Sequence, residues 1–283
     1  MKSSQFRSDS MLAGLTAKTN SGRIYGSARA RAQDRHREIV VSSSRLAGLF
    51  ALAVTALVLV HALVQIACFA TGNERLYGLV TAFSLGGERN APALYSTFAL
   101  FFSALLLGVI ATRSARDRLY WWVLAAVFVF LGMDEFLEIH EKLIVPMRGA
   151  LHAQGAFYYT WIIPYGIGAA LFGLAYLRFL SRLPRRTAVL FVLAGAIFVA
   201  GAIGMEMIGG VLAERAGTRQ VGVVLEQTAE EVLEMSGIVL FIYALADYLA
   251  KDLGGVAVRL RACAGRTSPR LNEGARSRSP IMD

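Results

Sequence analysis

The sequence predicts an all-α integral membrane protein: a polytopic transmembrane helical bundle of about six spans, with both termini on the cytoplasmic side. Hydrophobic residues make up 55% of the 283 residues, and charged residues make up only 17%. A soluble domain carries about a quarter charged residues. The charges also gather in the terminal and connecting segments, which leaves long uncharged stretches between them.

Six apolar segments lie near the length of about 20 residues that a helix needs to cross a bilayer. Small residues recur inside several of them, as is typical of helices that pack closely in lipid. The flanking segments are rich in Arg and poor in large apolar side chains, so they are expected to be disordered tails at 1–44 and 252–283 around a domain at 45–251. The predicted spans are 46–70, 94–112, 119–141, 158–180, 187–210 and 221–250.

Basic residues mark every second connection between these spans. The two tails and the loops at 113–118 and 181–186 are basic, whereas the alternate connections are nearly balanced in charge. The positive-inside rule assigns the basic side to the cytoplasm. The net charge of +9 is thereby accounted for by topology and by an anionic lipid surface, so the bilayer is the expected partner and no nucleic acid is expected.

Carboxylates interrupt the third and sixth predicted spans. A charge inside a bilayer is costly, so ionisable residues at membrane depth indicate a functional site. The stretch of the third span without charged residues is too short to cross the hydrocarbon core, so the acids that follow it are expected to lie within the membrane. The residues concerned are Asp134, Glu135, Glu138, His140 and Glu141 in the third span, and Glu226, Glu230, Glu231 and Glu234 in the sixth.

Four predicted spans deliver polar side chains to one depth. At 1.5 Å per residue from the basic end, Asp134 lies about 22 Å and Glu234 about 25 Å into the membrane. His61 and Glu206 lie about 24 Å and 30 Å deep by the same count. The sequence therefore predicts one polar layer near the outer surface.

The helical period adds a prediction about which side chains share a face. Within a continuous third span, Asp134, Glu138 and Glu141 fall within about 60° of one another, and His140 points away. The sixth-span acids at a spacing of four residues likewise share a face.

The leading interpretation is a metal-dependent membrane enzyme that acts on a lipid-like or other small substrate at the outer side. Carboxylates and histidines suit a divalent ion such as Zn, Mn or Fe. Asp134, Glu135 and Glu231 are the expected acid/base groups, and Glu88, Asn90, Glu206 and Glu226 are further polar candidates. The expected ligands are Glu138, Glu141, Glu230, Glu234, His61 and His140.

Other interpretations remain open. The same carboxylates could form the pathway of a proton- or cation-coupled transporter. The acids could instead lie in a solvated vestibule of a structural or partner-binding protein. Asn90 also has a purely structural interpretation as the cap of a helix with Pro92 in its first turn.

Three motifs carry a resemblance to a known group of proteins. They are Glu88-x-Asn90-x-Pro92-x-x-Tyr95-Ser96, Met133-Asp134-Glu135 with Ile139-His140-Glu141, and Glu230-Glu231-x-x-Glu234-Met235-x-Gly237. Together they resemble an uncharacterised family of bacterial multipass membrane proteins. The resemblance implies a bacterial cytoplasmic (inner) membrane location and supplies no activity.

Overall fold

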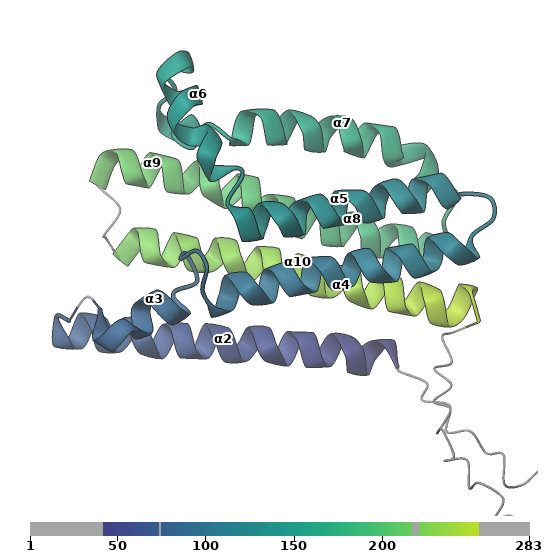
Figure 1. Cartoon of the computed structure of the whole chain (residues 1–283), viewed down its shortest axis with the longest axis horizontal. Helices are drawn as coiled ribbons and strands as arrows, with labels where there is room; N and C mark the ends of the chain where they lie inside the picture. Colours follow the sequence, from purple (N-terminus) through teal and green to yellow (C-terminus); the bar gives the residue numbers. More distant parts are fainter. Residues whose placement is uncertain (1–41, 74, 217–220, 255–283) are drawn as a thin grey trace, which may run out of the picture. The chain divides into compact units, whose positions relative to one another are not determined.

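The computed structural model describes residues 42–73, 75–216 and 221–254. Nearly all of the two predicted tails lies outside these residues. All regular secondary structure in the described part is helical, and six of its helices are long and apolar enough to cross a membrane (Figure 1). The predicted all-α bundle of six spans is confirmed.

The six spans run close to the predicted segments and are joined by short helical turns. The short elements are η1 (Leu76–Gly78), α3 (Leu79–Phe83), η2 (Glu141–Leu143), α6 (Ile144–Leu151) and η3 (Gly155–Phe157). The spans are α2 (Ser43–Thr71), α4 (Ala91–Arg113), α5 (Arg118–Leu137), α7 (Ile162–Leu180), the run α8 (Arg185–Val199), η4 (Ala200–Met205) and α9 (Glu206–Ala216), and α10 (Val221–Asp252).

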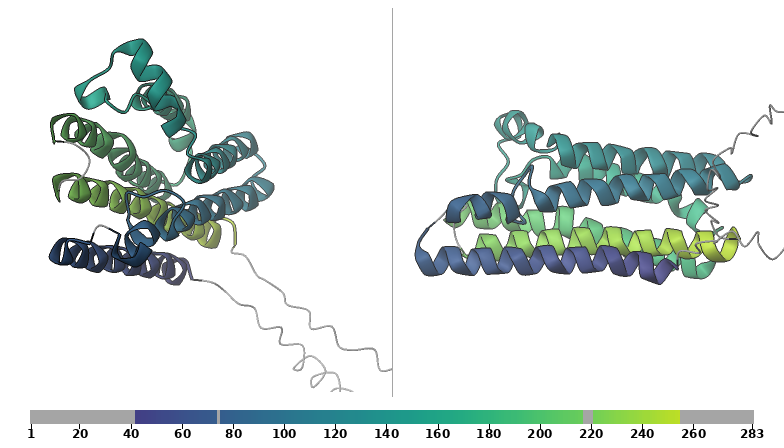
Figure 2. Two further views of the ribbon diagram at one scale, coloured as in Figure 1. Left: turned by 60° about the vertical axis from the view of Figure 1, so that its left-hand side comes forward. Right: turned by 60° about the horizontal axis from the view of Figure 1, so that its bottom comes forward.

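Helix α10 is the centre of the bundle. It packs against α2, α4, α8, η4 and α9, and the two views of Figure 2 show the long helices running side by side. A Cβ at Gly237 would lie 2.8 Å from the backbone nitrogen of Phe198. The missing side chain therefore lets α10 and α8 approach closely.

The two ends of the bundle differ in character. α2 begins and α10 ends at one end, which we call the basic end (Figure 1). There Arg182 lies 2.6 Å from Asp117, and Arg186 lies 3.0 Å from Asp247. The opposite end, which we call the acidic end, carries the carboxylates. The positive-inside rule predicts that the basic end faces the cytoplasm.

An aromatic core fills the half of the bundle next to the basic end. The buried ring of Trp121 packs edge-on against Phe179 at 5.0 Å, and Phe128 stacks on Phe241 at 4.6 Å. Phe191 joins the same buried group. This half is therefore packed with apolar side chains between the acidic and basic ends.

The third span ends earlier than predicted. Helix α5 stops at Leu137, and Glu138 takes a left-handed conformation with φ of 54°. The ammonium group of Lys142 donates to the carbonyl oxygen of Leu137 at 2.6 Å and so satisfies one of the helix-end carbonyls. The prediction that Glu138 and Glu141 continue the helical stripe of Asp134 is wrong, because the helix has ended before either residue.

Helix α4 begins as its sequence predicts. The side-chain oxygen of Asn90 accepts a hydrogen bond from the backbone N–H of Ala93 at 3.1 Å, and a proline occupies the first turn. Asn90 also donates to the carbonyl of Ser84 at 2.6 Å. Asn90 is thus a helix cap that also fixes the preceding turn.

Candidate functional site

The carboxylates of five separate segments meet at the acidic end. Glu234 interacts electrostatically with Glu135, Glu206 and Glu88, which come from α5, α9 and the connection before α4. Glu88 in turn interacts with Glu141. We call this group the acidic cluster; its members are Glu88, Asp134, Glu135, Glu138, Glu141, Glu206, Glu226, Glu230, Glu231 and Glu234.

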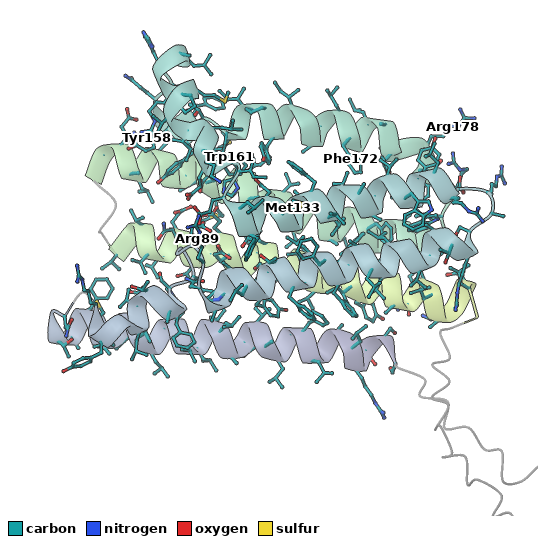
Figure 3. All side chains as sticks on the ribbon, viewed as in Figure 1. Arg89, Met133, Tyr158, Trp161, Phe172 and Arg178 are labelled. Carbon is teal, nitrogen blue, oxygen red and sulfur yellow. The ribbon has the colours of Figure 1, made fainter. Side chains whose placement is uncertain are left out.

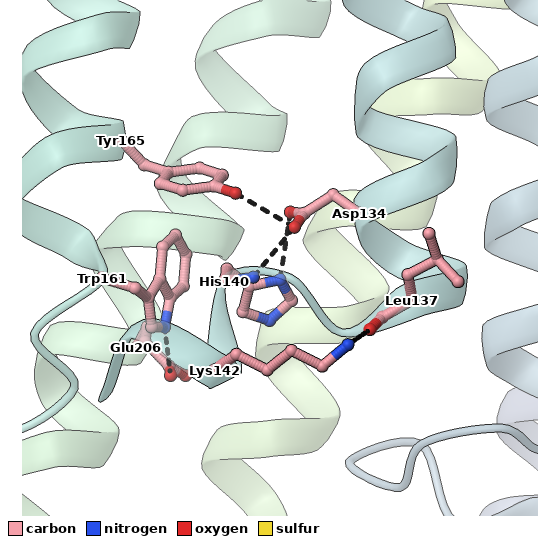
Figure 4. Close-up of polar contacts among 7 residues, drawn as sticks. All are labelled: Asp134, Leu137, His140, Lys142, Trp161, Tyr165 and Glu206. Carbon is pink, nitrogen blue, oxygen red and sulfur yellow. Dashed lines mark hydrogen bonds and ion pairs between the residues drawn. The ribbon is translucent and has the colours of Figure 1, made fainter. Parts of the chain in front are cut away.

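Asp134 holds three donors at once. Its Oδ1 accepts the backbone N–H of His140 at 2.9 Å and the hydroxyl of Tyr165 at 3.0 Å, while its Oδ2 lies 3.0 Å from Nδ1 of His140 (Figure 4). The carboxylate is buried. The prediction that His140 points away from Asp134 is wrong, because the chain turns back after Leu137 and brings the ring over the end of α5.

These contacts set the protonation of His140. Burial alone would lower the pKa of the ring, but the hydrogen bond and the negative charge of Asp134 outweigh it. The charges of Glu135 and Glu88 act in the same direction, so the pKa of His140 is raised above the usual histidine value. His140 therefore supplies a titratable positive charge within the acidic cluster.

Glu206 and Glu230 form a pair of carboxyl groups. Their side chains lie close together and interact electrostatically, and Oε1 of Glu206 accepts the indole N–H of Trp161 at 3.2 Å (Figure 4). Two carboxyl groups this close can share one proton, because a protonated carboxyl group donates to an ionised one.

Glycines bring the acids of α10 close to the α8–α9 run. A Cβ at Gly201 in the π-helical segment η4 would meet the carbonyl oxygen of Glu230 at 2.8 Å and the Cγ of Glu234 at 2.9 Å. A Cβ at Gly209 would meet the carboxylate of Glu226 at 2.8 Å. The π-helical segment η4 thus lies beside the carboxyl pair. Since π-helical segments are frequent at functional sites, this position supports a functional role for the acidic cluster.

Glu226 is a buried acid without a complete set of partners. Its Oε1 is buried and has no hydrogen-bond partner among the described residues. A buried polar atom without a partner is costly unless a ligand, water or ion satisfies it.

Arg89 is a site residue that the sequence analysis missed. Its Nε lies 2.6 Å from Oε1 of Glu138, and the carboxylate of Glu138 is mostly shielded from solvent. Loss of hydration and the charge of Glu141 raise the pKa of the neighbouring Glu88 to about 7, although His140 and Arg89 oppose the shift. The available signal was the position of Arg89 directly after Glu88, as one of two arginines in the outer connection at 71–93.

Aromatic side chains form one wall of the site. The ring of His140 lies 4.9 Å from that of Trp161, which packs edge-on against Tyr165 at 5.2 Å. Figure 3 shows Trp161 and Arg89 at the acidic end, with Arg178 at the opposite end. Burial and the charge of Glu206 raise the pKa of Tyr159 to about 12. The sequence analysis assigned no role to the hydrogen-bond donors of Tyr165 and Trp161.

His61 lies outside this wall and has partners at both ring nitrogens. Its Nδ1 accepts the backbone N–H of Leu85 at 3.0 Å, so the proton of the neutral ring is on Nε2, which donates to the hydroxyl of Thr228 at 3.0 Å. The acceptor nitrogen and the N–H donor of the ring are thereby both used within the protein. A metal-ligand role for His61 would require these bonds to break.

The chemistry of the cluster favours hard cations. Its ligand atoms are carboxylate oxygens, together with Nε2 of His140 when the ring is neutral, and such oxygen donors suit Mg²⁺, Ca²⁺ and Mn²⁺. Within the described residues, no group of three or more His, Cys, Asp or Glu side chains is already arranged as a set of metal ligands. Coordination by several of the predicted ligands would therefore require side-chain movement.

Fold and site together define an integral membrane protein with six helical spans and an acidic cluster at one end. The chain belongs to the family described as "Domain of unknown function (DUF8692)", whose model matches residues 51–248. This range includes all ten members of the acidic cluster and confirms the resemblance to a family of unknown function. No curated protein and no solved structure matches the chain.

Proposed function

We propose that the acidic cluster binds a divalent cation in exchange for protons. The closely spaced carboxyl groups of Glu206 and Glu230 carry this proposal, because a proton shared by the two groups would be the one that an incoming cation displaces. A divalent ion would bring the two positive charges that the cluster needs. Arg89 and the titratable His140 are the cations that act on the cluster through the described contacts, against ten acids.

The buried oxygen of Glu226 supports the same assignment. It lies on the face of α10 that also carries Glu230, and its charge acts on Glu206 and Glu230. A cation or a water of its hydration shell would supply the missing partner. Glu206, Glu230 and Glu234 are the proposed ligands, with Glu226 contributing through its free oxygen.

We favour an enzyme over a carrier because the acidic cluster lies at one end of the bundle and can be reached from that side of the membrane. The aromatic core between the acidic and basic ends separates the cluster from the basic side. We therefore propose a metal-dependent enzyme of a bacterial cytoplasmic membrane whose site opens away from the cytoplasm. A bound divalent ion would act as a Lewis acid on an amphiphilic substrate that reaches the site from the bilayer. Asp134 would hold His140 as the proton-exchanging group.

A proton-coupled carrier is a second candidate, favoured by the π-helical segment η4. This segment interrupts the α8–α9 run beside the carboxyl pair, and such irregular segments are places where transmembrane helices bend. In a carrier, exchange of the Glu206–Glu230 proton for a cation would be coupled to that bend. Net uptake of Mn²⁺ into proteoliposomes, driven by a proton gradient, would distinguish the carrier from the enzyme.

The first experiment measures Mn²⁺ binding and proton release together. Isothermal titration of the purified full-length protein with MnCl₂, in two buffers of different ionisation enthalpy, gives the protons released per bound ion. We expect saturable binding with proton release near neutral pH. The Glu206→Gln/Glu230→Gln double variant keeps the size and hydrogen-bonding capacity of the two side chains but has no titratable proton, so it should lose both the binding and the release.

Glu214→Gln is the matched control. Glu214 lies at the acidic end outside the cluster, where its carboxylate accepts the backbone N–H of Gly155 at 2.6 Å, and a glutamine oxygen can accept the same bond. This variant should bind Mn²⁺ as the wild type does. Absence of saturable binding of Mn²⁺, Zn²⁺ and Fe²⁺ by the wild type would refute the proposal, as would equal binding by the double variant.

A further inference from the structure

A second feature lies on the lipid-facing side, away from the acidic cluster. An apolar groove of about 590 Å³ runs between α4 and α5. Gly108 forms part of its floor, where an added Cβ would come no closer than 3.5 Å to the ring of Trp122. The lining includes Phe101, Leu105 and Val109 from α4, and Trp122, Ala126 and Val129 from α5.

Both walls of the groove lead to an arginine at the basic end. On α4 the lining residues Leu105 and Val109 continue, at a spacing of four, to Arg113 in the last turn. On α5, Arg118 precedes the lining residue Trp122 by four positions in the first turn. Residues four apart lie on the same helix face, so Arg113 and Arg118 extend the two lining faces of the groove toward the basic end.

We propose that this groove binds an anionic phospholipid, with an acyl chain between α4 and α5 and the headgroup phosphate on Arg113 and Arg118. Arg116, in the loop between the two helices, is exposed and adds a third positive charge at the same level. Basic pockets between helices on the cytoplasmic side are places where anionic headgroups bind. The apolar lining fits the chain and the arginines fit the phosphate.

Charge also argues against a second copy of the protein as the occupant. Two copies in one membrane have the same orientation, so a symmetric contact along this groove would bring two sets of the same arginines to one level. Like charges at one level repel each other, whereas a phosphate carries the opposite charge. The lipid is therefore the better complement to this surface.

The test uses lipids whose brominated acyl chains quench tryptophan fluorescence on contact. The protein is reconstituted in phosphatidylcholine vesicles that contain either brominated phosphatidylglycerol or an equal fraction of brominated phosphatidylcholine. The difference between wild type and Trp122→Phe isolates the signal of Trp122. We expect the brominated anionic lipid to occupy the groove with a preference on the order of tenfold, and added salt to reduce this preference.

Two variants and a control connect the signal to the groove. Arg113→Gln/Arg118→Gln should abolish the preference, and Gly108→Leu should reduce quenching by either lipid because its side chain fills the floor. Arg178→Gln/Arg185→Gln removes two exposed arginines from the same end but away from the groove, and should retain the preference.

Three results would overturn the proposal. One is equal quenching by the two brominated lipids in the wild type. Another is loss of the preference in the Arg178→Gln/Arg185→Gln control to the same extent as in Arg113→Gln/Arg118→Gln. The third is a dimer of the wild type in detergent that Gly108→Leu converts to a monomer, because a second copy would then occupy the groove.

Discussion

Asp134 and His140 are joined by two hydrogen bonds, one from the backbone N–H of His140 and one at its ring nitrogen Nδ1. The carboxylate in the last turn of α5 thus fixes both the path of the following segment and the position of the imidazole. The same pair contributes the titratable positive charge of the acidic cluster. Its titration gives the first prediction.

Asp134→Asn should lower the pKa of His140 and weaken the outer segment. A raised histidine pKa means that the charged pair stabilises the folded state at low pH, and that this contribution is lost as the pH rises through the raised value. The variant should lose about 1–3 kcal/mol at pH 6 and less at higher pH. NMR titration of labelled histidine and thermal unfolding in detergent at several pH values measure the two effects.

His152→Gln is the control for this titration, because His152 is exposed and lies outside the cluster. It should leave the pH dependence of unfolding unchanged and identify the His152 resonance by its loss. An unaltered His140 titration in Asp134→Asn would contradict the assigned role of the carboxylate.

Glu88→Gln should stabilise the protein at neutral and alkaline pH. An acid with a folded-state pKa of about 7 binds more protons in the folded than in the unfolded protein, so stability falls as the pH rises from about 4.5 to 7. Removing the acid should therefore raise stability above pH 7 by on the order of 1 kcal/mol, after allowance for solvent screening, and have little effect near pH 4. Thermal unfolding of wild type and variant across this range is the measurement; parallel profiles would count against the raised pKa.

Gly201→Ala should destabilise the contact between η4 and α10. The added Cβ would meet backbone and side-chain atoms of Glu230 and Glu234 within 3.0 Å, so the two segments must separate at a cost of about 1–3 kcal/mol. Gly204→Ala lies in the same π-helical segment and meets nothing within 4 Å, so it should be neutral or slightly stabilising. Denaturation in mixed detergent micelles compares the two; equal effects would show that the close approach at Gly201 is unimportant.

His61→Leu should cost about 2–4 kcal/mol, because it leaves the N–H of Leu85 and the hydroxyl of Thr228 without their shared partner. His61→Asn offers an amide oxygen near the former Nδ1 position and should recover part of this loss. Neither variant should alter Mn²⁺ binding if His61 is a structural residue. Loss of Mn²⁺ from a folded His61→Asn protein would instead restore it as a ligand.

The sequence predicts the spans and the meeting of the acids more reliably than the geometry around each acid. Length and apolar content are properties of whole segments, so α2 and α10 begin and end within a few residues of their predicted limits. The end of α5 depends on one left-handed residue, Glu138, and glutamate gives no local signal for that conformation. The return of His140 to Asp134 follows from that turn and was therefore missed.

The sequence analysis also missed the hydrogen-bond donors that reach the acids from a distant segment of the chain. Tyr165 and Trp161 reach Asp134 and Glu206 only because α7 lies beside the ends of α5 and α9. Aromatic residues near span ends are common at the membrane interface, so their hydrogen-bonding role requires the tertiary arrangement. For His61 the sequence analysis proposed a role that the geometry does not require. An isolated histidine in a membrane span can be a metal ligand or can form the structural hydrogen bonds that are observed.

The π-helical segment η4 also affects how relatives of this protein should be compared. A π-helical turn holds one residue more than an α-helical turn, since its hydrogen bonds join residues five rather than four apart. A relative that lacks η4 would align with this chain only through a one-residue gap between the positions of Ala200 and Glu206. An ungapped alignment would rotate the equivalent of Glu206 by about 100° and remove it from the carboxyl pair.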